Sequence, residues 1–268
     1  MGMPRDLVLV RHGESEGNIA NRRSRRGDDS HFTPEFRERS GADWRLTLKG
    51  VEQARRAGKW IRENIGEKFE RYYCSEYIRA AETALELQLP EAHWFMTHVL
   101  RERDWGALES MPDSERKERF TEELERRKRD FYRWSPPGGE SVANVCGRTK
   151  DLLDTLAREC DGQRVIIVSH GETCWSIRIN LERWNQQQFA EIYNSVDGPR
   201  KLLWNCSVLH YTRRNEQCQV EPYFCRVRSV WPEDPAMTDT GFVPIIRRRY
   251  ANQELREYVE RIPRLIEE

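Results

Sequence analysis

The chain has 268 residues, which is long enough for one large domain or two modest ones with a substantial hydrophobic core. Its 45 Lys and Arg residues balance 45 Asp and Glu residues, so no net charge draws it toward nucleic acid or a membrane surface. No apolar run is long enough to cross a bilayer, and no secretory signal is visible at the N-terminus. Seven cysteines without a C-x-x-C motif favour the cytoplasm and argue against a zinc site. We therefore expect a cytoplasmic globular protein that does not act on nucleic acid or membranes.

In the first hundred residues, apolar periodicity and turn signals predict alternating strands and helices. Thr47 is a predicted N-cap, because apolar residues at a helical period follow it. The predicted elements in chain order are a buried strand at 6–10, a polar loop or insert at 19–45, a helix at 46–61, a strand at 71–77 that leads into a helix, and a strand at 95–100.

Farther along, residues 113–134 carry dense, balanced charge, and Phe120, Leu124 and Phe131 recur on one helical face. This pattern predicts a surface helix that acts as a cap. After a SPPGGES break, the predicted elements are a helix at about 142–159, a strand at 164–169, a helix from about 172, an edge strand within WNCSVLHYTRR (204–214), and an amphipathic helix at 250–266.

The alternation of strands and helices indicates the α/β class. We expect a doubly wound, mostly parallel sheet flanked by helices, with a helical cap insert and a C-terminal extension. The main domain is predicted over 1–210, with the cap insert at about 105–137, and the extension over 211–268 is predicted to pack on the same domain. The last helix is expected to pack on the body in preference to mediating a dimer, and a homo-oligomer is left open.

Two His-Gly pairs each follow a β-branched run, in RHG (11–13) and SHG (169–171). Ligands of open α/β sheets bind beyond the carboxyl ends of the strands, which is where both pairs lie. Arg11 offers a planar guanidinium suited to phosphate oxygens, and the helices that follow offer N-terminal N–H groups. A single histidine of this kind is more often an ordinary strand-end residue, but the two together predict a phosphate site.

The segment RHGESEGN closely resembles the signature of the histidine phosphatase superfamily, the phosphoglycerate mutase-like branch. The resemblance continues in order through LTLKGVEQA, CSEYIRAAETA, LRERDWG, PPGGES and VSHGE, and covers roughly residues 6–210. The ordered set is highly specific, whereas any single piece would not be. The resemblance implies a doubly wound α/β catalytic domain and a reaction that passes through a phosphohistidine, with no metal and no other cofactor.

The resemblance also implies roles for particular residues: His12 as the nucleophile, Arg11, Arg79 and His170 as ligands of the transferring phosphoryl group, Glu102 as the acid that protonates the leaving oxygen, and Asn18 and Ser24 as phosphate contacts. The residue types agree with these roles, because neighbouring guanidinium groups disfavour the imidazolium form and keep a histidine nucleophile neutral. The loop around Ser24 departs from the common pattern. Asp104 and Glu109 remain rivals of Glu102 as the acid.

Other chemistry-bearing patterns are weaker. Ser15 lies in a G-x-S-x-G sequence, but the nucleophile elbow of serine hydrolases follows several strands and here only one precedes it. Cys74 and Arg79 are one residue too close for a cysteine phosphatase loop, and Cys174 is better explained as a buried structural thiol. An arginine cluster is equally compatible with capture of an anionic substrate and with a solvated loop: Arg22, Arg23, Arg25 and Arg26.

The predicted function is that of a metal-independent phosphatase acting on a small phosphorylated substrate. A mutase of the same family and a non-catalytic phosphate-binding or scaffold module are the alternatives. Mutases of the family carry an arginine pair before the Pro-Pro step, and the segment Arg133-Trp134-Ser135-Pro136 lacks it. The substrate itself is not predicted.

Overall fold

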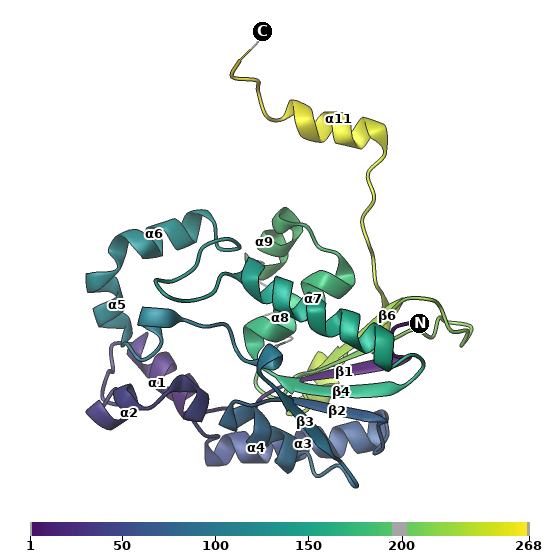
Figure 1. Ribbon diagram of the computed structural model, residues 1–268, viewed down its shortest axis with the longest axis horizontal. Helices are drawn as coiled ribbons and strands as arrows, with labels where there is room; N and C mark the ends of the chain where they lie inside the picture. Colours follow the sequence, from purple (N-terminus) through teal and green to yellow (C-terminus); the bar gives the residue numbers. More distant parts are fainter. Residues whose placement is uncertain (1, 195–202, 267–268) are drawn as a thin grey trace.

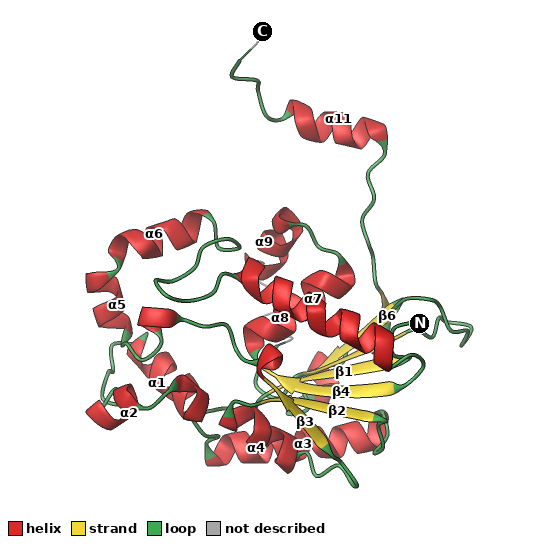
Figure 2. Ribbon diagram, in the orientation of Figure 1, coloured by secondary structure: helices red, strands yellow, loops and turns green. Residues whose placement is uncertain are grey.

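The computed structural model describes residues 2–194 and 203–266. A seven-stranded sheet runs through the described part, in the order β3-β2-β4-β1-β5-β6-β7 (Figures 1 and 2). The strands are β1 (Asp6–Arg11), β2 (Arg71–Ser75), β3 (Trp94–Thr97), β4 (Arg164–Ser169), β5 (Val208–Thr212), β6 (Arg226–Val230) and β7 (Val243–Pro244). Strands β1 to β4 are parallel to one another, and β5 to β7 add an antiparallel portion. The α/β class is confirmed, and the sheet is mixed.

Helices cover both faces of the sheet (Figure 2). The α-helices are α1 (Glu16–Ser24), α2 (Pro34–Glu38), α3 (Leu48–Asn64), α4 (Ile78–Glu86), α5 (Asp113–Arg119), α6 (Thr121–Arg129), α7 (Val142–Glu159), α8 (Gly171–Glu182), α9 (Gln186–Asn194), α10 (Pro235–Thr238) and α11 (Asn252–Glu260). One buried apolar cluster lies between the sheet and α7 and α8, and a second lies between the sheet and α3 and α4. A βαβ chain buries its parallel strands on both faces in this way.

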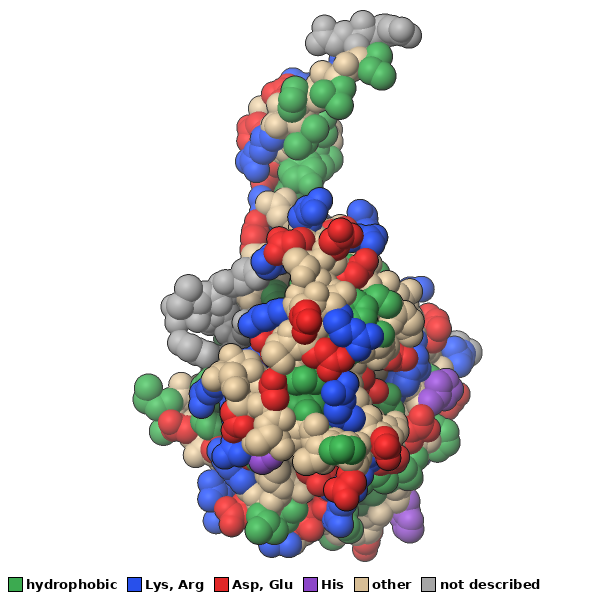
Figure 3. All heavy atoms as spheres, turned by 90° about the vertical axis from the view of Figure 1, so that its left-hand side faces the viewer, with side chains coloured by type: hydrophobic (Ala, Val, Ile, Leu, Met, Phe, Trp, Pro, Cys, Tyr) green, Lys and Arg blue, Asp and Glu red, His purple; other side chains and the backbone are tan. Residues whose placement is uncertain are grey.

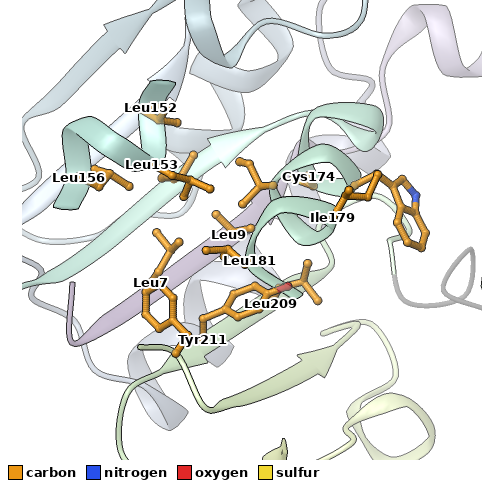
Figure 4. Close-up of a cluster of buried hydrophobic side chains, with 14 of the residues drawn as sticks. Leu7, Leu9, Leu152, Leu153, Leu156, Cys174, Ile179, Leu181, Leu209 and Tyr211 are labelled. Carbon is orange, nitrogen blue, oxygen red and sulfur yellow. The ribbon is translucent and has the colours of Figure 1, made fainter. Parts of the chain in front are cut away.

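Strand β1 shows how the core fixes the functional end of the sheet. Leu7 and Leu9 pack on the α7–α8 side, where they meet Leu153 and Cys174 (Figure 4). The alternate residues of the strand, such as Val8, pack on the α3–α4 side. Truncating a fully buried Leu in such a core costs about 2–5 kcal/mol. The end of the strand is therefore held rigidly, which positions the side chains that follow it.

The predicted loop at 19–45 is wrong in part, because α1, α2 and a short 3-10 turn (Gly41–Asp43) lie within or overlap it. Helix α1 begins at a capping box: the Ser15 hydroxyl accepts from the Asn18 backbone N–H, and the Asn18 side chain accepts from the Ser15 N–H. Such a cap satisfies orphan N–H groups and starts a helix in a segment with few apolar residues. Periodicity alone could not detect it.

The cap differs from the single helix predicted at 113–134. It holds two helices, α5 and α6, with a break at Phe120, whose backbone leaves helical geometry at φ −128 and ψ 33. The Phe120 ring packs on a small apolar cluster of Leu108, Met111 and Trp134 beneath the cap. The strand predicted at 95–100 also ends early, at Thr97, where a 3-10 turn takes over.

The C-terminal part departs most from expectation. The predicted edge strand at 204–214 is an interior strand, because β5 pairs with both β1 and β6. A domain division at 210 would cut β5, and we infer that the main unit continues through β7. The expected packing of the last helix is not present: α11 is exposed along its length, since the segment before it leads away from the body (Figure 1).

Candidate active site

Two adjacent strand ends bring His12 and His170 together. Strands β1 and β4 are parallel neighbours with Arg11 opposite Ser169, so the residues that follow them meet. The imidazole centroids are 5.0 Å apart, and both side chains are buried. The His12 backbone N–H donates to the Ser169 carbonyl at 2.9 Å, which locks the two ends together.

The hydrogen bonds of His12 define its tautomer. Its Nδ1 lies 2.7 Å from the Gly13 carbonyl, which can only accept, so Nδ1 carries the proton. Its Nε2 accepts from Nε of Arg79 at 3.3 Å and therefore presents a lone pair. Burial, together with the charges of Arg79 and Arg11, holds the pKa of His12 well below its ordinary value. The imidazole is neutral at pH 7, as a nucleophile must be.

His170 is held in a second hydrogen-bonded arrangement. Its Nε2 lies 2.9 Å from Oγ of Ser75, which accepts from the Tyr77 backbone N–H at 3.2 Å. The Ser75 hydroxyl can donate to Nε2 while it accepts from Tyr77, and in that tautomer the proton of His170 lies on Nδ1. That Nδ1 is buried and has no hydrogen-bond partner among the described residues. Burial, followed by the charge of Arg79, lowers the pKa of His170 well below its ordinary value.

Two arginines, the buried Arg79 and the partly buried Arg11, complete the positive end of the site. Arg79 donates to the Gly41 carbonyl at 2.6 Å. Arg11 donates to the Leu203 carbonyl, but its Nε is buried without a partner in the described structure. Burial lowers the pKa of both groups, and the charge of Glu102 opposes this, so both remain cations at pH 7. The arrangement leaves donors available for an anion.

Glu102 is the carboxylate that faces these groups. Its Oε1 accepts from the backbone N–H groups of Arg103, at 2.9 Å, and Glu172, at 3.2 Å. A Cβ built on Gly171 would lie 3.5 Å from the Arg11 guanidinium carbon and 3.7 Å from Oε2 of Glu102. The second oxygen of Glu102 and Arg11 therefore converge on the same point at the start of α8.

The rival acids are placed differently. Asp104 does not line the cavity beside His12, and its Oδ1 accepts from the Gly106 N–H at 2.7 Å. Glu109 does line that cavity, and burial, followed by the charge of Asp104, raises its pKa. Geometry thus keeps Glu109 as a rival of Glu102 and places Asp104 in a turn.

The two predicted phosphate contacts have separate outcomes. Asn18 lines the cavity, and its Oδ1 accepts from the side chain of Asn205 at 3.0 Å, a neighbour that sequence analysis missed. Ser24 does not line the cavity. Its hydroxyl donates to Asp29 at 2.5 Å and accepts from the Asp113 N–H at 2.6 Å. Ser24 is therefore engaged in joining α1 to α5 and does not face the space beside His12.

The alternative nucleophiles lack the surroundings that activate a nucleophile. Ser15 lines the cavity beside His12, but it is the N-cap of α1, and its hydroxyl accepts from the Asn18 N–H. Burial raises the pKa of Cys74 to about 11 and that of Cys174 to about 12, so both stay thiols at neutral pH. These environments do not support serine-esterase or cysteine-phosphatase chemistry.

His12 lines a cavity of about 380 Å³ that extends from the strand ends to the cap. From the arginine cluster at 22–26, Arg22 and Arg25 line this cavity, whereas Arg23 pairs with Asp28 at 3.6 Å. The cavity has an aromatic wall of Trp44, Trp105, Trp175 and Tyr193.

Two cap arginines that sequence analysis did not single out, Arg116 and Arg127, also line the cavity. Their neighbourhood in the sequence has the alternating charges of a solvated helix, so no local signal distinguishes them. Acidic and basic side chains are interspersed over the face that carries the cap (Figure 3).

Within residues 2–194 and 203–266, no group of three or more His, Cys, Asp or Glu side chains could hold a metal ion. The same residues include no helix both long enough and apolar enough to span a bilayer.

The fold and the site together define an α/β protein with two histidines and two arginines gathered at the carboxyl ends of parallel strands. The chain belongs to the histidine phosphatase superfamily, branch 1, whose family model matches residues 7–221. This match includes both His-Gly strand ends and the cap.

Curated relatives and solved structures agree with this assignment. The 2,3-bisphosphoglycerate-dependent phosphoglycerate mutase of Parvibaculum lavamentivorans is 32% identical over 206 residues, which cover 74% of this chain and 89% of that protein. The enzyme of the same name from Rhizobium etli is 30% identical over 200 residues, 72% of this chain and 88% of that protein.

Among solved structures, a mycobacterial glucosyl-3-phosphoglycerate phosphatase complexed with VO3 has a TM-score of 0.60 at 20% identity, over 82% of this chain and 99% of that one. The alpha-ribazole phosphatase of Shigella flexneri has a TM-score of 0.59 at 20% identity, over 82% and 95%. At this identity the likeness concerns the fold.

Proposed function

We propose that the protein is a phosphatase that hydrolyses a phosphomonoester through a phosphohistidine on His12. The observation that carries this proposal is the pairing of a neutral imidazole lone pair on His12 with buried, unpartnered nitrogens, Nε of Arg11 and Nδ1 of His170. Buried donors without acceptors are costly, and a phosphate group would satisfy them. Phosphoryl transfer depends mainly on positioning and on such electrostatic stabilisation.

In the first step, the substrate phosphate lies between His12 and His170, and Arg79 turns its guanidinium from Nε2 of His12 to the phosphate oxygens. Nε2 then attacks phosphorus, the ester P–O bond breaks, and the carboxyl of Glu102 gives its proton to the leaving oxygen. The Gly13 carbonyl accepts from Nδ1–H and stabilises the positive charge that develops on the ring.

In the second step, water attacks the phosphorus of the phosphohistidine, and the P–N bond breaks. The carboxylate of Glu102 takes a proton from that water, which restores the acid for the next cycle. Inorganic phosphate leaves, and the lone pair returns to Nε2 of His12. No metal or other cofactor takes part in either step.

A mutase is the second candidate, because curated relatives at about 30% identity carry that name. In a mutase the phosphohistidine would pass its phosphoryl group to a substrate hydroxyl instead of water. The segment before the Pro-Pro step favours the phosphatase, because Arg133 is exposed and does not line the cavity.

The test is to trap label from a phosphomonoester labelled in its phosphoryl group, in the presence of EDTA, in the wild type, His12→Ala and Ser15→Ala. We expect base-stable, acid-labile protein label that is absent only from His12→Ala. Label released as inorganic phosphate supports the phosphatase, whereas transfer to an added hydroxy acid supports the mutase.

Two results would contradict the proposal. Loss of label in Ser15→Ala alone, in a variant shown to be folded by circular dichroism, would assign the nucleophile to the serine. A wild type that binds phosphate esters but neither forms label nor turns them over would leave a non-catalytic binding module.

A further inference from the structure

The cap side of the cavity holds three arginines that are not in ion pairs with other described residues. Arg25 follows α1, Arg116 lies on α5 and Arg127 lies on α6, and all three line the cavity that His12 enters. None of them forms a salt bridge with a described residue. Neighbouring arginines of the same elements are paired: Arg22 with Glu14 at 2.7 Å and Arg119 with Glu115 at 2.6 Å.

The acidic residues nearby do not neutralise this group. Asp113 lines the cavity but pairs with Lys117 at 2.6 Å, and Glu172 pairs with Arg103 at 3.1 Å. Burial raises the pKa of Glu109, which weakens it as a counter-ion. The cap side of the cavity is therefore positive. Two of its carboxylates, Asp113 and Glu172, are in ion pairs with other residues, and the third, Glu109, has a raised pKa.

Arg116 has a buried donor that no described residue satisfies. Its Nη2 donates to the Glu109 carbonyl at 3.2 Å, but its Nε is buried and has no hydrogen-bond partner among the described residues. Burial, followed by the charge of Arg25, lowers the pKa of Arg116 to about 10, and the charge of Arg127 acts in the same direction. The residue is still a cation at pH 7. Arg116 and Arg127 are partly buried and Arg25 is exposed. Like charges of this kind destabilise one another, most of all where a donor is buried without a partner, and an anion bound between them removes that cost.

Arg127 is presented to the cavity in a fixed orientation. Its guanidinium carbon lies 5.0 Å from the Trp105 ring centroid and 5.2 Å from that of Phe131. Stacking of this kind holds a planar guanidinium without consuming its in-plane donors. These donors suit the paired oxygens of a carboxylate or phosphate.

We propose that Arg25, Arg116 and Arg127 form a second anion subsite, so that the preferred substrate is a phosphomonoester with another phosphate or carboxylate at its distal end. This inference rests on the proposed function, because His12 and the Arg25–Arg116–Arg127 subsite open into one cavity of about 380 Å³. A single molecule would place its scissile phosphate at the strand ends and its second anion under the cap.

The test uses three matched series of esters with increasing chain length: n-alkyl phosphates, the same chains ending in a carboxylate, and the same chains ending in a second phosphate. Values of kcat/KM are measured for the wild type, Arg116→Gln and Arg127→Gln. Arg119→Gln on α5 and Arg126→Gln on α6 are matched controls, because both residues are exposed and lie in surface ion pairs.

At one chain length, we expect the wild type to prefer a doubly anionic ester over its alkyl counterpart by at least about tenfold, as charge-assisted hydrogen bonds allow. Arg116→Gln and Arg127→Gln should reduce this ratio at least about fivefold, and the two control variants should keep it. Comparing the two doubly anionic series identifies the second group as carboxylate or phosphate.

No preference at any chain length, or equal losses on alkyl and doubly anionic esters, would overturn the second subsite while leaving the phosphatase proposal intact. The opposite case, in which the subsite exists but the protein is not a phosphatase, is tested by calorimetric binding of alkane bisphosphonates, which cannot be hydrolysed. Binding that is weakened in Arg116→Gln but kept in Arg119→Gln, without turnover of any ester, would support the subsite and reject the phosphatase.

Discussion

At the scale of single residues, the assignment of the acid turns on two carboxylates that share one cavity. Glu102 has one oxygen held by two backbone N–H groups, and its other oxygen lies beside Gly171, as does the Arg11 guanidinium. Glu109 has the raised pKa that a general acid needs, through burial and the charge of Asp104. The position beside Arg11 and Gly171 favours Glu102 as the general acid, whereas the raised pKa of Glu109 favours Glu109.

We predict that Glu102→Gln slows hydrolysis of alkyl phosphates about 100-fold or more, because their leaving oxygen needs a proton. The loss should be much smaller for 4-nitrophenyl phosphate, whose leaving group is stable as an anion. The measurement is kcat for both esters in Glu102→Gln and in Glu109→Gln. If Glu109→Gln, and not Glu102→Gln, loses much more activity on the alkyl phosphate than on 4-nitrophenyl phosphate, the acid is Glu109.

At the scale of elements, Arg103 joins the cap to the core. This fully buried side chain donates to Glu172 on α8 at 3.1 Å, to the Glu140 carbonyl at 2.6 Å and to the Trp134 carbonyl at 3.0 Å. Its guanidinium also lies over the Trp105 ring. One cation thus holds together the segment after the acid, the end of the cap and the start of α8.

We predict that Arg103→Met lowers the free energy of unfolding by about 2–4 kcal/mol, because it removes the ion-pair partner of the partly buried Glu172 carboxylate and the donor to the carbonyls of Glu140 and Trp134. Chemical denaturation measures this loss, and Arg129→Met on the exposed side of α6 is the control. Burial, opposed by Arg103, already raises the pKa of Glu172. Removing Arg103 raises it further, so the loss should shrink as the pH falls and Glu172 becomes protonated.

The double variant Arg103→Met, Glu172→Gln completes the cycle. It should recover part of the stability, because a neutral amide replaces the unpaired charge. The contrary result is a double variant whose loss of stability equals the sum of the losses measured for Arg103→Met and Glu172→Gln separately. Such additivity would show that the two side chains do not interact.

The elements also show how far sequence reasoning reaches. The strands that carry His12 and His170 were predictable, because buried parallel strands are continuous apolar runs and their carboxyl ends meet at one edge. Helix α1 was not, because its start is a local hydrogen-bonded cap at Ser15 in a segment poor in apolar residues. The role of Ser24 was not predictable either, since its hydroxyl is engaged by Asp29 and by Asp113 in the distant cap.

At the scale of the whole molecule, the C-terminal segment divides into a part that completes the sheet and a part that leaves it. Strand β7 pairs with β6, and Arg247 donates to the carbonyls of Leu181, at 3.0 Å, and Phe224, at 2.8 Å. Beyond that point, α11 is exposed, and hydrophobic side chains gather along one side of it (Figure 3).

We predict that a chain ending at residue 250 keeps its free energy of unfolding within about 0.5 kcal/mol of the full chain, because the described residues removed are exposed. A chain ending at residue 242 should be less stable by more than this, since it loses β7 and the bonds of Arg247. Denaturation at low protein concentration measures the stability of both shortened chains, and sedimentation at higher concentration measures whether the full chain forms an oligomer.

Two apolar side chains of α11, Leu255 and Val259, are 45% and 64% exposed. Removal of 251–268 alone could instead lower the free energy of unfolding and also abolish an oligomer that the full chain forms. That result would contradict the prediction and show that α11 packs against a second chain, so that its exposed surface is a property of the single chain only.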